Sequence, residues 1–204
     1  MSAYEALAFS YDSLTHDIPY EQMLSYMEAL LQKHQIRPQT VLDLACGTGS
    51  MSVLLAKKGY QVLAADLSED MLAMAWEKAA VLENPPFFIC QSMQELRLPD
   101  TVDWVVCCLD SLNYVTKPAA VQRTFQRVFD NLRPGGLFVF DIRTPSFLRA
   151  MDGQVFLDET EDLCCIWRGE FSQRRNILSY YMDLFALDSD GKWLRDGELH
   201  EEYA

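Results

Sequence analysis

The chain has 204 residues, of which half are hydrophobic and 23% are charged, a composition typical of one globular domain rather than a disordered segment. Its 30 acidic and 17 basic residues give a formal net charge of −13, which disfavours nucleic acid as a partner. No stretch approaches the ~18 uninterrupted apolar residues of a membrane span, and the first residues lack a secretory signal pattern. We therefore expect a cytoplasmic protein with no membrane partner that acts on small molecules.

Four of the six cysteines form the adjacent pairs Cys107-Cys108 and Cys164-Cys165. Neighbouring side chains on a strand point to opposite faces, so neither pair makes an easy disulfide or a two-ligand metal clamp. The sequence contains no C-x-x-C and no zinc-like cysteine and histidine spacing. Reduced cysteines and no bound metal are expected.

Strand-like and helix-like segments alternate through the first two thirds of the chain, as in a doubly wound α/β sheet. The apolar patterns predict strands at residues 40–44, 61–66, 87–91, 102–109 and 137–142, and helices at residues 20–35, 50–58, 68–83 and 119–132. Residues 133–136, Arg-Pro-Gly-Gly, are expected to form the turn before the fifth strand.

The pattern changes in the last third, where residues 164–171, 177–187 and 193–203 predict an antiparallel three-stranded meander. We expect a core at residues 1–150 with an N-terminal lid helix, followed by an antiparallel appendage at 151–204.

The strongest local signal is the loop Val41–Ser50, in which Gly47 and Gly49 follow a strand and open a helix. Glycines there allow close backbone approach to a ligand, with amide N–H groups at the helix start. Asp66 ends the next strand, 17 residues after Gly49, where its carboxylate could accept both hydroxyls of a ribose. The arrangement predicts an adenosyl cofactor.

Two residues distinguish between adenosyl cofactors. Ser52 stands where the dinucleotide fingerprint has its third glycine, and Asp43 puts an acid inside the strand just before the loop. A carboxylate there would repel a pyrophosphate but favour the ammonium and sulfonium groups of S-adenosylmethionine. The charge pattern therefore favours S-adenosylmethionine over NAD.

Together these segments resemble the class I S-adenosylmethionine-dependent methyltransferases over about residues 4–145. Residues 41–50 are similar to their first motif, Asp66 to their ribose-binding acid, and residues 132–137 to the turn before their fifth strand. Residues 90–93 match their adenine loop, although Gln91 stands where an Asp is frequent. The resemblance implies a Rossmann-like, mostly parallel sheet of order 3-2-1-4-5.

The resemblance also implies which residues bind the cofactor, although Met71 and Met93 could equally be ordinary core methionines. The expected set is Tyr11, Asp43, Ala45, Gly47, Gly49, Asp66, Leu67, Met71, Ser92, Met93, Leu109 and Asp110.

The acceptor side is expected where the fourth strand ends, at residues 109–114. Tyr114 could form a wall near the methyl group, and Tyr11 belongs to an aromatic lead-in (Tyr4, Phe9, Tyr11, Asp12 and Tyr20) similar to a cofactor lid. If a general base is needed, Tyr11, Asp12, His16 and His200 are candidates. The candidate catalytic residues are thus Tyr11, Tyr114 and His200, with surface pairing to carboxylates as the alternative for His200.

One motif points elsewhere. Residues 84–87, Asn-Pro-Pro-Phe, copy a motif by which some methyltransferases grip a planar amine at the end of strand four, but here the motif precedes the third strand. We expect it to be only a loop that enters that strand.

The sequence therefore predicts transfer of a methyl group to nitrogen, oxygen or carbon of a small-molecule acceptor. An NAD-type oxidoreductase and a non-catalytic S-adenosylmethionine-binding module are the alternatives. The meander is either an insertion in a chain cut before its last core strands or a replacement for those strands. It is also a candidate surface for a homodimer.

Overall fold

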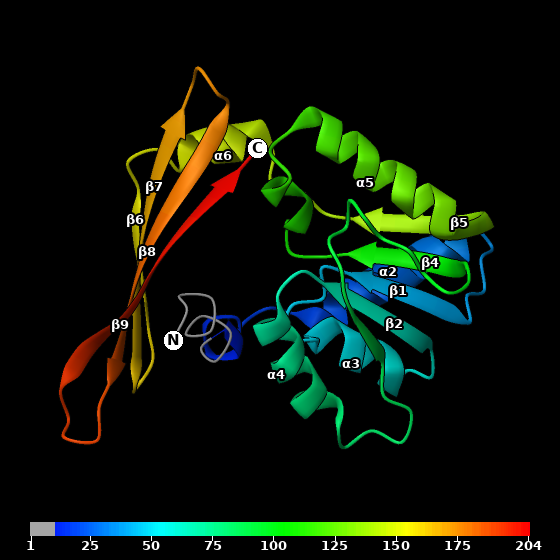
Figure 1. Cartoon of the computed structure of the whole chain (residues 1–204), viewed down its shortest axis with the longest axis horizontal. Coiled ribbons are helices and arrows are strands. Elements are labelled where there is room, and N and C mark those ends of the chain that lie inside the picture. Colours follow the sequence, from blue (N-terminus) through cyan, green and yellow to red (C-terminus); the bar gives the residue numbers. More distant parts are fainter. Residues whose placement is uncertain (1–10) are drawn as a thin grey trace. The chain divides into compact units, whose positions relative to one another are not determined.

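The computed structural model describes residues 11–204 and divides them into two compact units (Figure 1). The parallel-sheet unit comprises residues 18–112 and 118–141, and the antiparallel-sheet unit comprises residues 11–17, 113–117 and 142–204. No helix in this described part of the chain is long and apolar enough to cross a membrane. The expected division into 1–150 and 151–204 stays a prediction.

The first unit is built on five parallel strands in the order β3-β2-β1-β4-β5. This order and the Rossmann-like class confirm the prediction. The inner strands are almost continuously apolar, as strands buried on both faces are. Their bounds are β1 (Thr40–Leu44), β2 (Gln61–Asp66), β3 (Phe87–Cys90), β4 (Val102–Cys107) and β5 (Leu132–Phe140).

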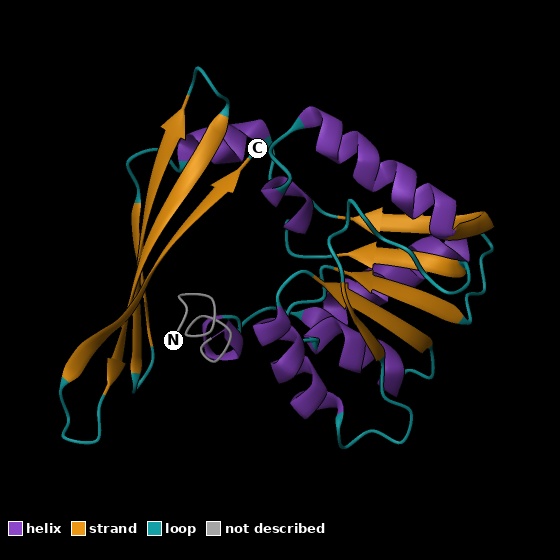
Figure 2. Cartoon of the chain, viewed as in Figure 1, coloured by secondary structure: helices purple, strands orange, loops and turns teal. Residues whose placement is uncertain are grey.

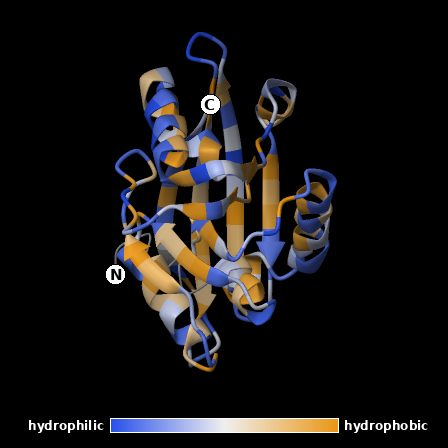
Figure 3. Cartoon of the chain, turned by 90° about the vertical axis from the view of Figure 1, so that its right-hand side faces the viewer, coloured by the Kyte–Doolittle hydropathy of each residue, from blue (hydrophilic) through white to orange (hydrophobic). Residues whose placement is uncertain are grey.

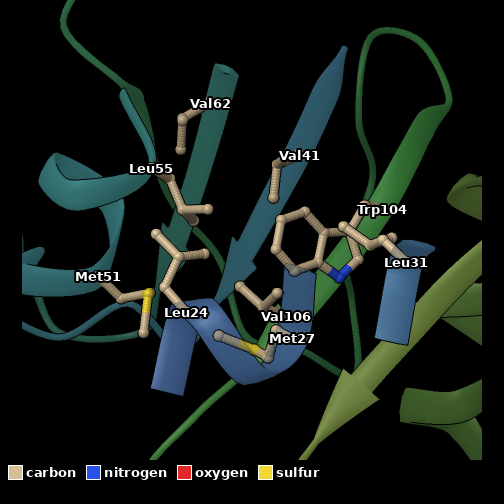
Figure 4. Packing of buried hydrophobic residues seen from close by; sticks show 9 residues of the cluster. All are labelled: Leu24, Met27, Leu31, Val41, Met51, Leu55, Val62, Trp104 and Val106. Carbon is tan, nitrogen blue, oxygen red and sulfur yellow. The ribbon is translucent and has the colours of Figure 1, made fainter. Parts of the chain in front are cut away.

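Helices cover both faces of this sheet (Figure 2). One face is packed by α2 (Tyr20–Lys33), α3 (Ser50–Lys57) and α4 (Glu69–Ala79), and the other by α5 (Pro118–Asn131). Figure 4 shows the α2–α3 layer packed around the fully buried Trp104 of β4. Apolar residues accordingly concentrate on the strands in Figure 3.

The start of β5 differs from the prediction. Residues 133–136 belong to the strand, which begins at Leu132, and the register with β4 shifts between Val102 and Trp104. Gly135 does have the positive φ expected of a turn, +85°. The residues predicted as a turn therefore form a bulge inside the strand. A Cβ on Gly136 would lie 2.7 Å from the carbonyl oxygen of Asp103, so close pairing also requires glycine there.

The second unit contains the helix α6 (Pro145–Ala150) and an antiparallel sheet of order β6-β7-β8-β9. Its strands are β6 (Val155–Glu159), β7 (Leu163–Ser172), β8 (Ile177–Leu187) and β9 (Trp193–Tyr203). The predicted meander is confirmed in β7–β9, but the count of three strands was wrong because β6 was missed. All five residues of β6 are exposed, so this short edge strand has no alternating burial that a sequence pattern could reveal.

Asp103 links β1 and β5 to β4 at the amino-terminal end of the parallel sheet. Its carboxylate accepts hydrogen bonds from the backbone N–H groups of Gln39 and Thr40, at 2.8 and 2.9 Å, and from the Thr40 hydroxyl at 3.0 Å. Arg133 at the start of β5 pairs with it at 2.8 Å. Burial acts to raise the pKa of Asp103, but the bonds from Thr40 and Gln39 hold this pKa below its usual value.

Asp103→Ala should lower the free energy of unfolding at pH 7 by about 1–3 kcal/mol, because the N–H groups of Gln39 and Thr40 lose a charged acceptor. A depressed pKa stabilises above the unfolded-state value, so the deficit should shrink as pH falls below about 4. Urea denaturation measures both effects. Asp130→Ala, which removes an exposed pairing partner of Arg127, should change the unfolding free energy by no more than about 0.5 kcal/mol. Equal losses in the two variants would contradict this role.

Candidate functional site

The carboxyl ends of β1, β2, β3 and β4 meet at one edge of the parallel sheet. In register, Asp43 of β1 lies beside Ala64 of β2 and Val106 of β4, and Asp66 of β2 lies beside Cys90 of β3. The loops that follow these strands therefore start side by side. This edge is where open α/β sheets bind ligands.

The loop after β1 has an unusual backbone. Ala45, Gly47 and Gly49 all have positive φ, at +59°, +54° and +76°. The Gly47 N–H donates to a carboxylate oxygen of Asp66 at 2.8 Å, so the loop is tied to the end of β2.

The two glycines have different reasons to be there. A Cβ on Gly47 would meet nothing within 4 Å, so this turn borders open space. A Cβ on Gly49 would lie 2.9 Å from the Cβ of Ala75, so Gly49 allows α3 and α4 to pack closely. Gly47 is thus the glycine that leaves room for a ligand.

The end of β2 offers a carboxylate and an exposed apolar side chain. The second oxygen of Asp66 accepts the N–H of Ser68 at 2.9 Å, which fixes the carboxylate orientation. Leu67 is 71% exposed, and its side chain could pack against a planar ring. Met71, by contrast, is buried in α4, and Met93 is partly buried against the core residues of β1 and β4. Contact of these methionines with the cofactor stays a prediction.

Asp43 is the most confined charge of the site. It is 2% exposed, and its carboxylate accepts a hydrogen bond from the Ser52 hydroxyl at 2.5 Å. Burial raises the pKa of Asp43 to about 6, the Ser52 bond opposes this shift, and the charge of Asp66 adds to it. Ser52, which departs from the dinucleotide fingerprint, is therefore the residue that satisfies the buried acid.

The loop after β4 is strained as well. Leu109 and Asp110 have φ of +57° and +49°, conformations rare for residues other than glycine. The Asp110 N–H donates to a carboxylate oxygen of Asp141 at 3.1 Å. Such strain persists where the surroundings enforce it, which is common at binding sites.

Two other sequence features have structural roles here. The Gln91 side chain accepts the N–H of Arg97 at 2.9 Å, closing the loop that contains Ser92. Asn84–Phe87 leads into the amino end of β3, where Phe87 pairs with Leu63, as expected for a loop that enters the strand.

Two thiols at this edge, those of Cys46 and Cys107, offer no nucleophile. Burial raises the pKa of the Cys46 thiol well above its ordinary value, and the charges of Asp43 and Asp66 raise it further. Burial does the same to Cys107. Both thiols therefore stay protonated at neutral pH.

The three candidate catalytic residues all lie in the antiparallel-sheet unit. The Tyr114 hydroxyl donates a hydrogen bond to the Glu201 carboxylate at 2.9 Å. The Tyr203 hydroxyl oxygen lies 2.5 Å from the Tyr114 hydroxyl oxygen. Tyr11 interacts electrostatically with Tyr114, so the unit brings these two phenols near each other. Tyr4 and Phe9 of the expected lid lie outside the described residues.

His200 lies on the other face of β9. Its ring stacks on Tyr181, with centroids 4.7 Å apart, while the alternating neighbours Glu201 and Tyr203 point into the core of the unit. His16 binds the carbonyl oxygen of Ser13 at 2.7 Å. Sequence reasoning missed Glu201 and Tyr203, although the buried Leu199 and Tyr203 on either side of Glu201 mark the inner face of the strand.

Comparison with known proteins adds the decisive observation. A family model described as a methyltransferase domain matches residues 41–136. The Bacillus subtilis (strain 168) protein YqeM, whose name suggests a methyltransferase, is 35% identical over 201 residues, 98% of this chain and 79% of its own. The chain belongs to the class I S-adenosylmethionine-dependent methyltransferases.

Two further relatives agree with this assignment. A solved S-adenosylmethionine-dependent methyltransferase from Clostridium acetobutylicum ATCC 824 matches this methyltransferase with a TM-score of 0.85 at 28% identity, covering 98% of this chain and 80% of its own. A ubiquinone biosynthesis O-methyltransferase of Xanthomonas oryzae pv. oryzae (strain PXO99A) is 30% identical over 88% of this chain and 69% of its own. The cofactor is therefore S-adenosylmethionine, as predicted, and NAD is not supported.

The residues at the sheet edge fit this cofactor. Open space at Gly47, the oriented Asp66 carboxylate and the exposed Leu67 suit an adenosyl group, and the acid at Asp43 suits a cation. When bound, S-adenosylmethionine supplies a methyl group activated by its sulfonium. The individual binding roles of these residues stay predictions.

The pKa of Asp43 predicts a pH dependence of cofactor binding. A cationic ligand favours the ionised carboxylate, so affinity for S-adenosylmethionine should rise up to about tenfold per pH unit between pH 5 and 6 and level off above. Asp43→Asn should weaken binding and remove this slope, whereas Asp100→Asn, in an exposed loop, should keep it. Fluorescence or calorimetric titration measures the affinities. A flat profile for the unmodified protein would refute the role of Asp43.

Proposed function

We propose that this methyltransferase transfers the methyl group to a nitrogen, oxygen or carbon of a small-molecule acceptor. The observation that carries the proposal is the charge of the site. Asp43, Asp66, Asp110 and Asp141 all lie at the ligand-binding edge of one sheet, in a chain of net charge −13. Such an edge attracts cations and repels the phosphate backbone of nucleic acids.

A small-molecule acceptor also agrees with one relative. The Xanthomonas protein, by its name, methylates oxygen in ubiquinone biosynthesis, and its similarity extends over 88% of the present chain. Similarity at 30% identity supports a class of acceptor rather than one compound. Nitrogen, oxygen and carbon acceptors therefore all belong in the first test, and the expected cytoplasmic location stays a prediction.

We assign binding of the cofactor to the parallel-sheet unit. The Gly47 loop and Asp66 would hold the adenosine, and Asp43 with Asp110 would hold the cationic end. Methyl transfer is an in-line displacement at an activated carbon, so alignment and exclusion of water can supply much of the rate. Tyr11 and Tyr114 are the proposed groups on the acceptor side.

The test is incubation of the full chain with S-adenosylmethionine carrying a labelled methyl group. Acceptors would be a panel of small amines, phenols and carbon acids, with transfer RNA and denatured protein tested in parallel. We expect label only in small-molecule products. Asp66→Ala should reduce turnover at least tenfold by weakening cofactor binding, since a carboxylate that orders both ligand and loop is lost.

The matched control is Glu69→Gln, in the exposed first turn of α4, which should keep full turnover. Label in RNA or protein would overturn the acceptor class. Cofactor binding without turnover on any acceptor would favour the non-catalytic alternative.

We also propose that the antiparallel-sheet unit pairs with a second copy of the chain through β6. Within the described residues, β6 is an edge strand of its sheet, and Val155, Phe156 and Leu157 are 65%, 41% and 60% exposed. Exposed apolar edge strands favour pairing with another strand. A second copy supplies an identical strand, and two-fold pairing closes the assembly at a dimer.

Light scattering during size-exclusion chromatography tests this proposal. The unmodified chain should elute with the mass of a dimer, and Leu157→Lys should shift it to monomer by placing a charge on the edge. Val81→Lys replaces a residue that is 86% exposed in the other unit and should leave the dimer intact. A monomeric unmodified chain would contradict the proposal.

A further inference from the structure

A lysine side chain reaches the glycine loop from the neighbouring helix. Lys78 lies in the last turn of α4, and its ammonium nitrogen donates hydrogen bonds to the hydroxyl oxygens of Ser50 at 2.8 Å and Thr48 at 3.2 Å. These two residues lie on either side of Gly49, where the loop ends and α3 begins. Both contacts and the loop belong to the parallel-sheet unit.

The close approach of α4 to the loop depends on small residues. A Cβ on Gly49 would lie 2.9 Å from the Cβ of Ala75, so the loop and α4 meet closely at this point. Ala75 precedes Lys78 by three residues, a spacing that places both side chains on one face of a helix. The face of α4 that packs against the loop therefore also directs the ammonium group towards it.

The loop is attached at both of its ends. The Cys46 N–H donates to the Ala65 carbonyl oxygen at 3.0 Å and the Gly47 N–H donates to Asp66 at 2.8 Å, so the first half of the loop is fixed to β2. The Lys78 contacts hold the second half, where α3 begins. Gly47, where an added Cβ would meet nothing within 4 Å, is thus followed directly by a residue that is held from α4.

The contact does not serve as a cap for α3. The N-cap residue of this helix is Gly49, which has no side chain to cap it. The first turn of a helix carries a partial positive charge, so an ammonium beside the start of α3 is not stabilised by that helix. The hydrogen bonds of Lys78 to the two hydroxyls therefore link the loop to α4.

We propose that Lys78 is a positioning residue for cofactor binding. Its hydrogen bonds keep residues 48–50, and with them the Gly47 backbone, in the conformation that accepts the adenosyl group, which lowers the entropic cost of binding. The inference rests on the proposed assignment of the Gly47 loop and Asp66 to the adenosine. The role requires hydrogen-bond donors at the end of the Lys78 side chain and does not require its charge to meet the cofactor.

The test is calorimetric titration of the full chain and its variants with S-adenosylmethionine and with S-adenosylhomocysteine. Lys78→Met keeps a long apolar side chain but removes the donors. It should weaken the binding of both ligands about tenfold, the size of a lost hydrogen bond that involves a charged group. Lys78→Arg supplies donors again and should recover most of the affinity.

The two ligands separate positioning from charge. They share the adenosine and differ in the sulfonium, so a displaced loop should weaken the binding of both by the same factor. If the ammonium acted through its charge, Lys78→Met would strengthen the binding of S-adenosylmethionine relative to S-adenosylhomocysteine, because repulsion between two cations would be lost. That result would overturn the inference.

Ser50→Ala removes the same contact from its other end, and alanine is well tolerated in a helix. It should weaken the binding of both ligands a few-fold. The double variant with Lys78→Met should lose less affinity than the product of the two single losses, because the shared hydrogen bond is lost only once. Losses that multiply fully would contradict the proposed contact. This arm keeps the inference testable if Lys78→Met disturbs the packing of α4.

The matched control is Lys58→Met, which replaces an exposed lysine just after α3 and should leave both affinities unchanged. Melting temperatures measured without ligand should be alike in the variants, which shows that a lost affinity does not arise from unfolding. Asp66→Ala on the same assay tests the assignment of the loop. Full affinity in Lys78→Met with weakened binding in Asp66→Ala would overturn this inference alone, whereas full affinity in both would overturn the assignment of the loop as well.

Discussion

The contact between Asp43 and Ser52 is the constraint on which the proposed cofactor site depends. A carboxylate stands on β1 between two parallel strands, 2% exposed, with a serine hydroxyl at 2.5 Å. The rise of its pKa from 3.8 to about 6 corresponds to a cost on the order of 3 kcal/mol for keeping it ionised at neutral pH. Because the folded-state pKa is raised, Asp43 stabilises the fold most below about pH 4, and that stability is lost as pH rises towards 6. A cationic ligand offsets the cost.

The two units use acidic residues in related ways. In the parallel-sheet unit, the backbone of the Gly47 loop binds Asp66, and the strained turn at Asp110 is tied to Asp141. In the antiparallel-sheet unit, phenols bind Glu201 while arginines neutralise Asp183. The described partners also separate a structural acid such as Asp103, bound by two backbone amides and Arg133, from Asp43, which accepts a hydrogen bond from the Ser52 hydroxyl.

The sequence was sufficient for most of the fold and for the cofactor. Periodicity placed β1, β2, β8 and β9 at their observed bounds, because buried strands alternate or are continuously apolar. The sequence pattern did not predict the edge strand β6 because none of its residues is buried. The predicted fifth strand was shorter than the observed β5 because Pro134, Gly135 and Gly136 have the composition of a turn. In both places pairing between strands, which is not local in sequence, decided the structure.

The surroundings of the candidate catalytic residues were less predictable for the same reason. The sequence indicated Tyr11, Tyr114 and His200 as separate candidates, with surface pairing to carboxylates as the alternative for His200. The partner of Tyr114 is Glu201, 87 residues away, and only the strand alternation around Leu199 and Tyr203 shows which face it occupies. Ser52 was counted as a departure from a fingerprint, and its contact with Asp43 could be known only from the packing of α3 against β1.

The most direct test of the account is a count of the protons released when S-adenosylmethionine binds. Calorimetric titration at pH 5.5, in buffers of different ionisation enthalpy, should show release of roughly 0.7 proton per site, because a carboxyl of pKa about 6 is mostly protonated before a cation arrives. At pH 8 the release should vanish, since Asp43 is then already ionised. Proton uptake, or no proton release at pH 5.5, would contradict the claim that a buried carboxylate selects the cationic cofactor.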